Sequence, residues 1–116
     1  MISMREAYEK IGANYDDACA RLMGEEMLAR FALKFLDDES MDKLEAAMAA
    51  GDAEGAFMAA HTLKGVAQNL GFDGLYRAAF ALTEEMRGGK PLTDTALYDA
   101  VTQQQQIVID AVRQLA

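Results

Sequence analysis

The sequence is poor in the residues that build disulfides, metal sites and β-strands. Its 116 residues contain one histidine, one cysteine, one proline and no tryptophan. The lone Cys19 cannot form an internal disulfide, which favours a reduced cytosolic protein with an ordinary thiol. A single histidine without a cysteine pair argues against a metal site. β-Branched residues nowhere alternate in a strand-like run, which argues against a β-sheet.

Basic residues are also in short supply. Lysine and arginine number 11 against 19 aspartates and glutamates, which gives a formal net charge of −8. Nucleic acids and anionic membrane surfaces both attract basic proteins, so neither is expected as a partner. No apolar run approaches the roughly 18 residues of a membrane span, and residues 1–6 lack the character of a signal peptide. We therefore expect a cytoplasmic monomer with no nucleic-acid or membrane partner.

Helix-forming residues are what the sequence has in plenty. Alanine, leucine, methionine and glutamate are frequent, and 52% of the residues are hydrophobic. The length suits one domain, residues 1–116, with a packed core. Apolar residues recur at helical spacing in a series of segments. The predicted helices span approximately residues 3–11, 14–22, 25–50, 52–70, 72–87 and 94–115.

The predicted helix over residues 25–50 contains a run of acidic residues that leaves two possibilities open. It is either continuous or broken near residues 37–40, with Ser40 as a new N-cap. Asn14 and either Thr93 or Asp94 are expected N-caps elsewhere. The glycines expected at helix ends are Gly12, Gly24, Gly51, Gly71 and the pair Gly88-Gly89.

Four long amphipathic segments with short connections predict an all-α, antiparallel, up-and-down four-helix bundle over residues 24–115. Residues 1–22 form a shorter helical segment before it. The tight turn at Gly71 should pair the 52–70 helix with the 72–87 helix. Gln104 falls within the apolar stripe of the last helix, and the sequence does not indicate its partner.

The only histidine, His61, falls on the polar side of the predicted 52–70 helix. On a helix that turns about 100° per residue, His61 points roughly 150° away from the middle of the apolar arc. A structural core histidine should lie within the arc, so we expect His61 to be exposed. The residues of that arc are Ala56, Ala60, Leu63, Ala67 and Leu70.

Three residues that follow His61 share its face, because they lie at i+3, i+4 and i+7: Lys64, Gly65 and Gln68. A glycine inside a helix costs about 1 kcal/mol relative to alanine, and a close approach by another molecule would offset that cost. An imidazole is largely neutral near pH 7, and its ring nitrogen is then a nucleophile that can attack phosphorus. Lys64 would supply positive charge to the phosphate oxygens and Gln68 a hydrogen bond.

The segment around His61 closely resembles the histidine phosphotransfer (HPt) domain. The run His61-Thr62-Leu63-Lys64-Gly65 has the family's His-x-x-Lys-Gly core, preceded by Ala59-Ala60 and followed by Asn69-Leu70-Gly71. The resemblance extends from about Leu22 to the end of the chain. It includes a Phe-x-x-x-Phe helix, Phe31 and Phe35, and an Ala-x-x-Gly-Asp turn that ends at Gly51-Asp52.

The resemblance implies a phosphoryl carrier rather than an enzyme. In such a relay, a receiver domain phosphorylated on aspartate passes its phosphoryl group to the histidine, which passes it to a second receiver. A histidine kinase can also act as the donor. The receiver brings the Mg²⁺ and the catalytic lysine, so no cofactor is expected on this chain. The sequence has no ATP-binding motif and therefore is not the kinase itself.

A partner must dock closely against His61, and the sequence suggests a surface for it. Gly65 leaves room for the partner. Phe57, one turn before His61, is expected to form a small apolar ring around the histidine with Met58 and with Met27 or Leu28 of a neighbouring helix. The alternative for Phe57 is simple packing between helices at the edge of the bundle.

Functions of other classes have less support in the sequence than phosphotransfer. A di-iron bundle needs Glu-x-x-His, but the residue three before His61 is Met58. Neither Ser3 nor Ser40 lies in a nucleophile motif of a Ser-His-Asp enzyme. The remaining alternative is a helical adaptor that docks a signalling partner while His61 stays unphosphorylated.

Overall fold

The structure is a computed structural model that describes residues 1–115. Seven α-helices, one short 3-10 helix and no strand occur in that range, which confirms the all-α prediction. The helices are α1 Met4–Ile11, α2 Tyr15–Arg21, α3 Glu25–Lys34, η1 Phe35–Asp37, α4 Ser40–Ala50, α5 Ala53–Leu70, α6 Asp73–Glu85 and α7 Thr95–Arg113. No helix of the described residues has the length and apolar character needed to cross a lipid bilayer.

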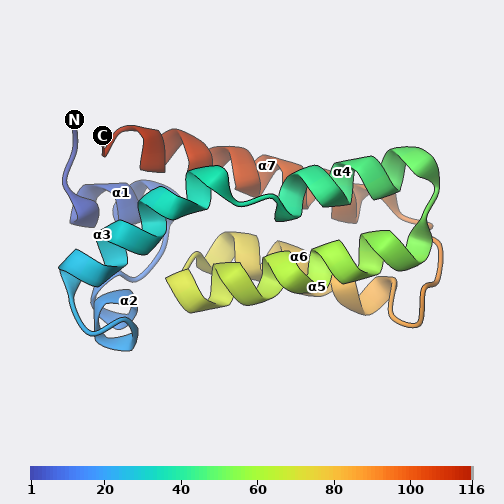
Figure 1. The fold of residues 1–116 in the computed structure, drawn as a ribbon, viewed down its shortest axis with the longest axis horizontal. Helices are drawn as coiled ribbons and strands as arrows, with labels where there is room; N and C mark the ends of the chain where they lie inside the picture. The colour runs from blue at the N-terminus through green and yellow to red at the C-terminus, as the bar shows by residue number, and fades with distance from the viewer. Residues whose placement is uncertain (116) are drawn as a thin grey trace.

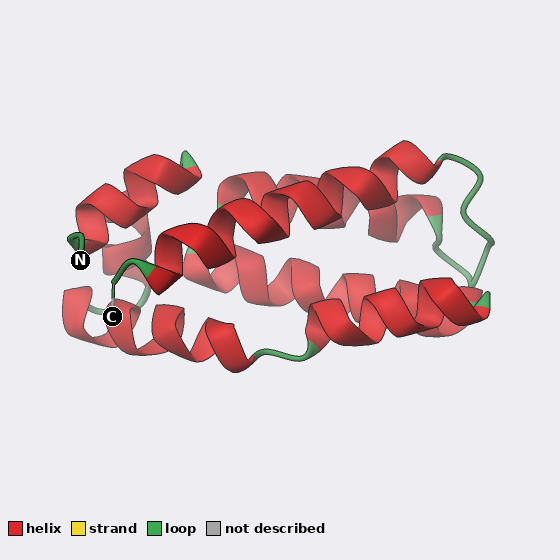
Figure 2. Ribbon diagram, turned by 90° about the horizontal axis from the view of Figure 1, so that it is seen from above, coloured by secondary structure: helices red, strands yellow, loops and turns green. Residues whose placement is uncertain are grey.

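The long helices lie side by side along the length of the molecule (Figure 1). Helix α5 packs against both α4 and α6, and α6 packs against α7. Helices α3 and α4 follow one another along one side, separated by a short loop that is clear in Figure 2. Helix α1 packs on α7 and α2 on α5. The first residues of the chain and the end of α7 lie at one end of the molecule (Figure 1), where the Ile2 amide donates to the Gln114 carbonyl at 2.9 Å.

The predicted 25–50 helix is broken rather than continuous. Helix α3 ends at Lys34, one 3-10 turn follows, and Asp38 is extended with φ −69° and ψ 132°. The Asp38 carboxylate accepts the Ser40 amide at 2.8 Å, an Asx-type turn. Ser40 as an N-cap is therefore wrong, because Glu39 occupies that position and Ser40 is the first residue of α4.

Other expected helix ends agree with the structure. The Asn14 side chain accepts the Asp17 amide at 3.0 Å, and the Asp94 side chain accepts the Ala96 amide at 3.0 Å. These two bonds satisfy amides that lack a partner within the helix. The pattern of N-caps and glycines therefore fixed most helix boundaries to within about three residues of their observed places, within the usual uncertainty of such assignments.

A continuous hydrophobic core fills the space between the helices. The apolar arc predicted for α5 is buried: each of its five residues is at most 4% exposed. Alanines in this arc allow α5 to lie close to its neighbours. The Gln104 amide of α7 lies against α6 at Gly74, in the space that a Cβ would occupy. The space left by the missing side chain of Gly74 thus explains how the polar Gln104 fits within the apolar stripe of α7.

The turn between α5 and α6 sets the position of the two helices. Gly71 has φ 73°, and the Phe72 amide donates to the Ala67 carbonyl at 2.9 Å, as in a Schellman-type helix end. The Tyr8 hydroxyl donates to the Leu70 carbonyl at 2.6 Å. Burial raises the pKa of the Tyr8 phenol above its usual value, so the hydroxyl stays a donor even at an alkaline pH where a free phenol would ionise. Helix α1 thereby anchors the end of α5.

A substitution of Gly71 tests this close packing. Alanine at φ 73° is strained by about 1–2 kcal/mol, and its Cβ would lie 3.0 Å from the Cβ of Ala18. Gly51 has a similar φ of 69°, but nothing lies within 4 Å of a Cβ placed there. In urea denaturation, Gly71→Ala should therefore lower the free energy of unfolding more than Gly51→Ala. Equal losses would show that α2 does not press against the turn.

Candidate functional site

His61 lies in the middle of α5 and faces away from the core. The helix begins with Asp52 as N-cap, whose carboxylate accepts the Gly55 amide at 2.9 Å, and continues for 18 residues. His61 is exposed, whereas Ala60 and Leu63 are completely buried. The expected exposure of His61 is therefore confirmed, and a rigid helix presents its ring to solvent. Phosphorylation of that ring stays a prediction.

The three residues expected to share the face of His61 lie on its exposed side. Lys64 is half-buried, and its Nζ lies 5.5 Å from the centre of the Phe80 ring on α6. Gly65 is exposed, and no atom lies within 4 Å of a Cβ built there. Gln68 is exposed as well. The surface next to His61 thus combines one ammonium group with an open stretch of helix backbone.

Phe57 makes the aromatic contact to the histidine. The ring centroids of Phe57 and His61 are 6.2 Å apart and the ring planes are 19° from parallel, an offset stacked arrangement. Phe57 is also half-buried and packs against the core. Packing against the core and a contact with His61 therefore coexist at Phe57, whereas its role in docking a partner stays a prediction.

Three residues that the sequence did not indicate also line this surface: Phe80 and Glu84 of α6, and Arg87 in the turn that follows α6. The Arg87 guanidinium carbon lies 5.7 Å from the centre of the Phe57 ring. Arg87 also donates two hydrogen bonds to the Glu84 carboxylate, at 2.5 and 3.3 Å. Hydrogen bonding from Arg87 is the main reason that the pKa of Glu84 lies below its usual value. The i,i+3 spacing could have indicated this pair, but not its place beside α5.

The expected apolar ring around His61 is only partly present. Met58 is 54% exposed but lines a groove between α4 and α5, together with Ser40 and Lys43. Leu28 is wrong as a docking residue because it is completely buried in the core. Met27 is exposed, yet it lies in the first turn of α3, at the end of the molecule where α5 ends (Figure 1). Helix α6, not α3, therefore flanks His61 on its aromatic side.

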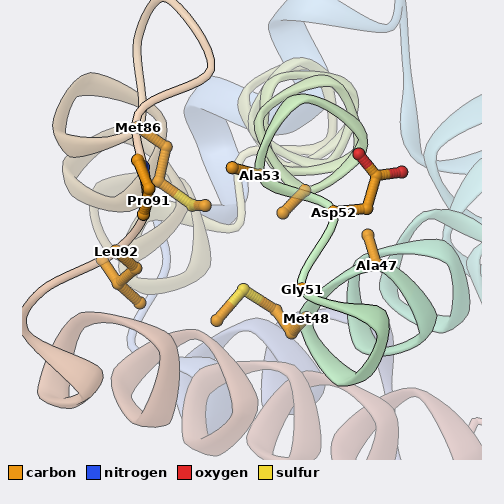
Figure 3. A pocket seen from close by; sticks show the side chains of 9 residues that line it. Ala47, Met48, Gly51, Asp52, Ala53, Met86, Pro91 and Leu92 are labelled. Atoms are coloured by element: carbon orange, nitrogen blue, oxygen red, sulfur yellow. The ribbon is translucent and has the colours of Figure 1, made fainter.

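A separate apolar pocket of about 180 Å³ lies at the end of the molecule where α5 begins. Met48, Met86, Pro91 and Leu92 line it, from the α4 end and the loop before α7 (Figure 3). Its carboxylate, Asp52, already caps α5. The pocket therefore holds no free nucleophile or base and is not part of the His61 surface.

The residues around His61 do not form a set of metal ligands in the part of the chain that the structure describes. Across residues 1–115, no three side chains of histidine, cysteine, aspartate or glutamate come together as a metal site requires. The neighbours of His61 at i−4, i−3, i+3 and i+4 are Phe57, Met58, Lys64 and Gly65, none of which is a common metal ligand.

The family model described as the Hpt domain matches residues 26–115. No curated protein and no solved structure matches the chain. The match covers most of the chain, from α3 to α7, so this protein belongs to the Hpt family. Hpt domains are phosphocarriers of two-component signalling that interact with receiver domains and histidine kinases. Helices α1 and α2 lie outside the matched range.

Proposed function

We propose that this protein is a histidine phosphotransfer protein with His61 as the phosphoacceptor. His61 receives a phosphoryl group from a receiver-domain aspartate or a histidine kinase and passes it to a receiver domain of a phosphorelay. The observation that carries the proposal is an exposed imidazole in the middle of a rigid helix, followed one turn later by an uncovered glycine. A flat partner surface that approaches the ring would meet no side chain at residue 65.

The chemistry needs little from this chain. The lone pair of the neutral imidazole forms the N–P bond while the P–O bond to the donor aspartate breaks, and that electron pair leaves with the donor carboxylate. Transfer to the next receiver is the reverse reaction on a second aspartate. Lys64 is placed to offset the charge of the phosphoryl oxygens. The Mg²⁺ belongs to the receiver, and this chain binds no cofactor.

The wider arrangement follows from the same proposal. We propose that residues 24–115 form an antiparallel, up-and-down four-helix bundle, with α3, η1 and α4 together as its first, broken arm. The chain forms one Hpt domain, with residues 1–22 as a helical addition. It acts as a cytoplasmic monomer and binds neither nucleic acid nor membrane, in keeping with its net charge of −8.

A transfer assay tests this function. The purified chain is mixed with a receiver domain labelled on its aspartate with ³²P, and the label should move to the chain within the lifetime of the aspartyl phosphate. The label should be lost in acid and stable in alkali, as expected of a phosphoramidate. If the chain instead binds receivers but takes up no label from any receiver or kinase of the source genome, it is an adaptor. That result would overturn the proposal.

Lys64 and Gln68 should tune the reaction rather than enable it. Lys64→Ala removes the ammonium group next to the phosphoryl oxygens, and Gln68→Ala removes a donor on the same face, so we expect slower transfer or a shorter phosphohistidine lifetime. Both side chains lie on the exposed side of α5, so the free energy of unfolding should change by at most about 0.5 kcal/mol. Lys10→Ala, which removes an exposed lysine of α1, is the control. If both variants match the parent and Lys10→Ala, neither residue takes part.

A further inference from the structure

We propose that Phe57 is a positioning residue for the His61 imidazole: it holds the ring plane and rotamer from which the nitrogen reacts. This inference rests on the proposed function of His61. It concerns a residue one turn before the histidine, so it adds a part to the site that the His-x-x-Lys-Gly run does not contain.

The geometry of the helix places the two rings together. Side chains on an α-helix lean towards its N-terminus, so the side chain of His61 lies over the turn that carries Phe57. The rings are stacked, with centroids 6.2 Å apart and planes 19° from parallel. Phe57 is half-buried and packed against the core, whereas His61 is exposed. The packed ring of Phe57 therefore limits the orientations that the His61 ring can adopt.

The other residues next to His61 do not hold its ring in place. The Thr62 hydroxyl next to the histidine donates back to the Met58 carbonyl at 3.0 Å. Within residues 1–115, no hydrogen bond reaches either ring nitrogen of His61. On the other side, at i+4, Gly65 offers no side chain. The imidazole is thus covered towards the start of the helix and open towards its end.

Phe57 itself is held by Arg87, in the turn that follows α6. The Arg87 guanidinium lies over the Phe57 ring, 5.7 Å from its centre, within the range of a cation–π contact. Two hydrogen bonds to Glu84 of α6 keep Arg87 in place. Packing against the core and the guanidinium of Arg87 therefore restrict the Phe57 ring, which in turn restricts the His61 ring.

The expected effect on rate is modest and measurable. Loss of one stacked aromatic pair should change a rate or a conformational population by about two- to tenfold. This range is the energy of such a pair converted at a factor of ten per 1.36 kcal/mol. Phe57→Leu should keep the apolar packing and lose the stack. Phe57→Tyr should keep both the apolar packing and the stack on His61. Phe31→Leu on α3 is the matched control, because Phe31 is also half-buried and has a lysine, Lys34, over its ring.

Two readouts separate positioning from docking and from stability. The first is the pair of imidazole proton signals in the NMR spectrum, which need no assignment because His61 is the only histidine. The second is the rate of histidine phosphorylation by phosphoramidate, a small donor that needs no receiver surface. There the imidazole nitrogen forms the N–P bond and ammonia leaves. Circular dichroism and urea denaturation check that each variant is folded.

The outcomes are distinct. Phe57→Leu should move both ring signals towards those of an unstructured histidine and slow phosphorylation about two- to tenfold, with Phe57→Tyr and Phe31→Leu at parent values. Parent-like ring signals and rates in folded Phe57→Leu would overturn the inference. A parent protein that shows the ring shifts but takes no phosphoryl group from phosphoramidate or receivers would instead overturn the proposed function, since the NMR readout needs no phosphorylation.

Discussion

His61→Gln should take up no phosphoryl group from any receiver or kinase that labels the parent protein. Glutamine has no ring nitrogen with a nucleophilic lone pair, and the chain contains no second histidine to replace it. The fold should be unchanged, because His61 is exposed and its loss removes only the stack on Phe57. We expect the free energy of unfolding to change by less than about 1.5 kcal/mol, the upper range for one aromatic pair.

The assay combines labelling with urea denaturation of the same samples. Phe31→Leu changes a residue of α3 that lies beside the end of α5, near Val66 and Asn69, and serves as a folded control that should be labelled like the parent. Labelling of His61→Gln at the parent level would mean that the phosphoryl group is carried elsewhere, for example on a carboxylate. Loss of labelling together with loss of structure would assign His61 a structural role instead of a chemical one.

Gly65→Leu should produce the second large effect, a loss of transfer from receivers of about 100-fold, the scale expected when reacting atoms are held about 1 Å out of place. Side chains lean towards the helix N-terminus, so a leucine at residue 65 would lie over His61. Nothing lies within 4 Å of its Cβ, so the protein should accommodate it and gain up to about 1 kcal/mol in stability, since leucine is the better helix former.

Two comparisons make this result specific. Gln103→Leu adds an exposed leucine on α7, away from α5, and should leave transfer unchanged. Phosphoramidate is small, so its reaction with Gly65→Leu should be slowed less than transfer from a receiver. Parent-like transfer in Gly65→Leu would show that the receiver approaches by another face. The docking contact itself should be weak and small, at or below about 1,200 Å² in total.

The helices were predictable because their signals are local. The apolar period marked the buried arc of α5, and Asn14, Asp94 and the left-handed glycines marked helix ends. Ser40 failed for a local reason too: Asp38, two residues earlier, satisfies its amide. Several polar residues compete for a cap in this acidic run, and composition alone does not decide between them.

The surroundings of His61 were harder to predict because they depend on which helix lies beside α5. The hypothesis placed α3 there and chose Met27 or Leu28, whereas α6 and the turn after it supply Phe80, Glu84 and Arg87. The hairpin at Gly71 contains the missing information. Lys64 and Phe80 lie eight residues before and after Phe72, and Phe57 and Arg87 lie fifteen before and after it. Residues equidistant from a tight turn meet across an antiparallel pair, so these contacts follow from the turn.

The central claim is that His61 carries the phosphoryl group, and tandem mass spectrometry of the receiver-labelled protein tests it most directly. Proteolytic digestion and chromatography at neutral or alkaline pH preserve a phosphoramidate before the peptides are fragmented. The account predicts one phosphoryl group per chain, located on His61 within the α5 segment and absent after brief treatment with acid. A phosphoryl group on an aspartate, serine or threonine, or a chain that stays unmodified while the receiver loses its label to water, would contradict it.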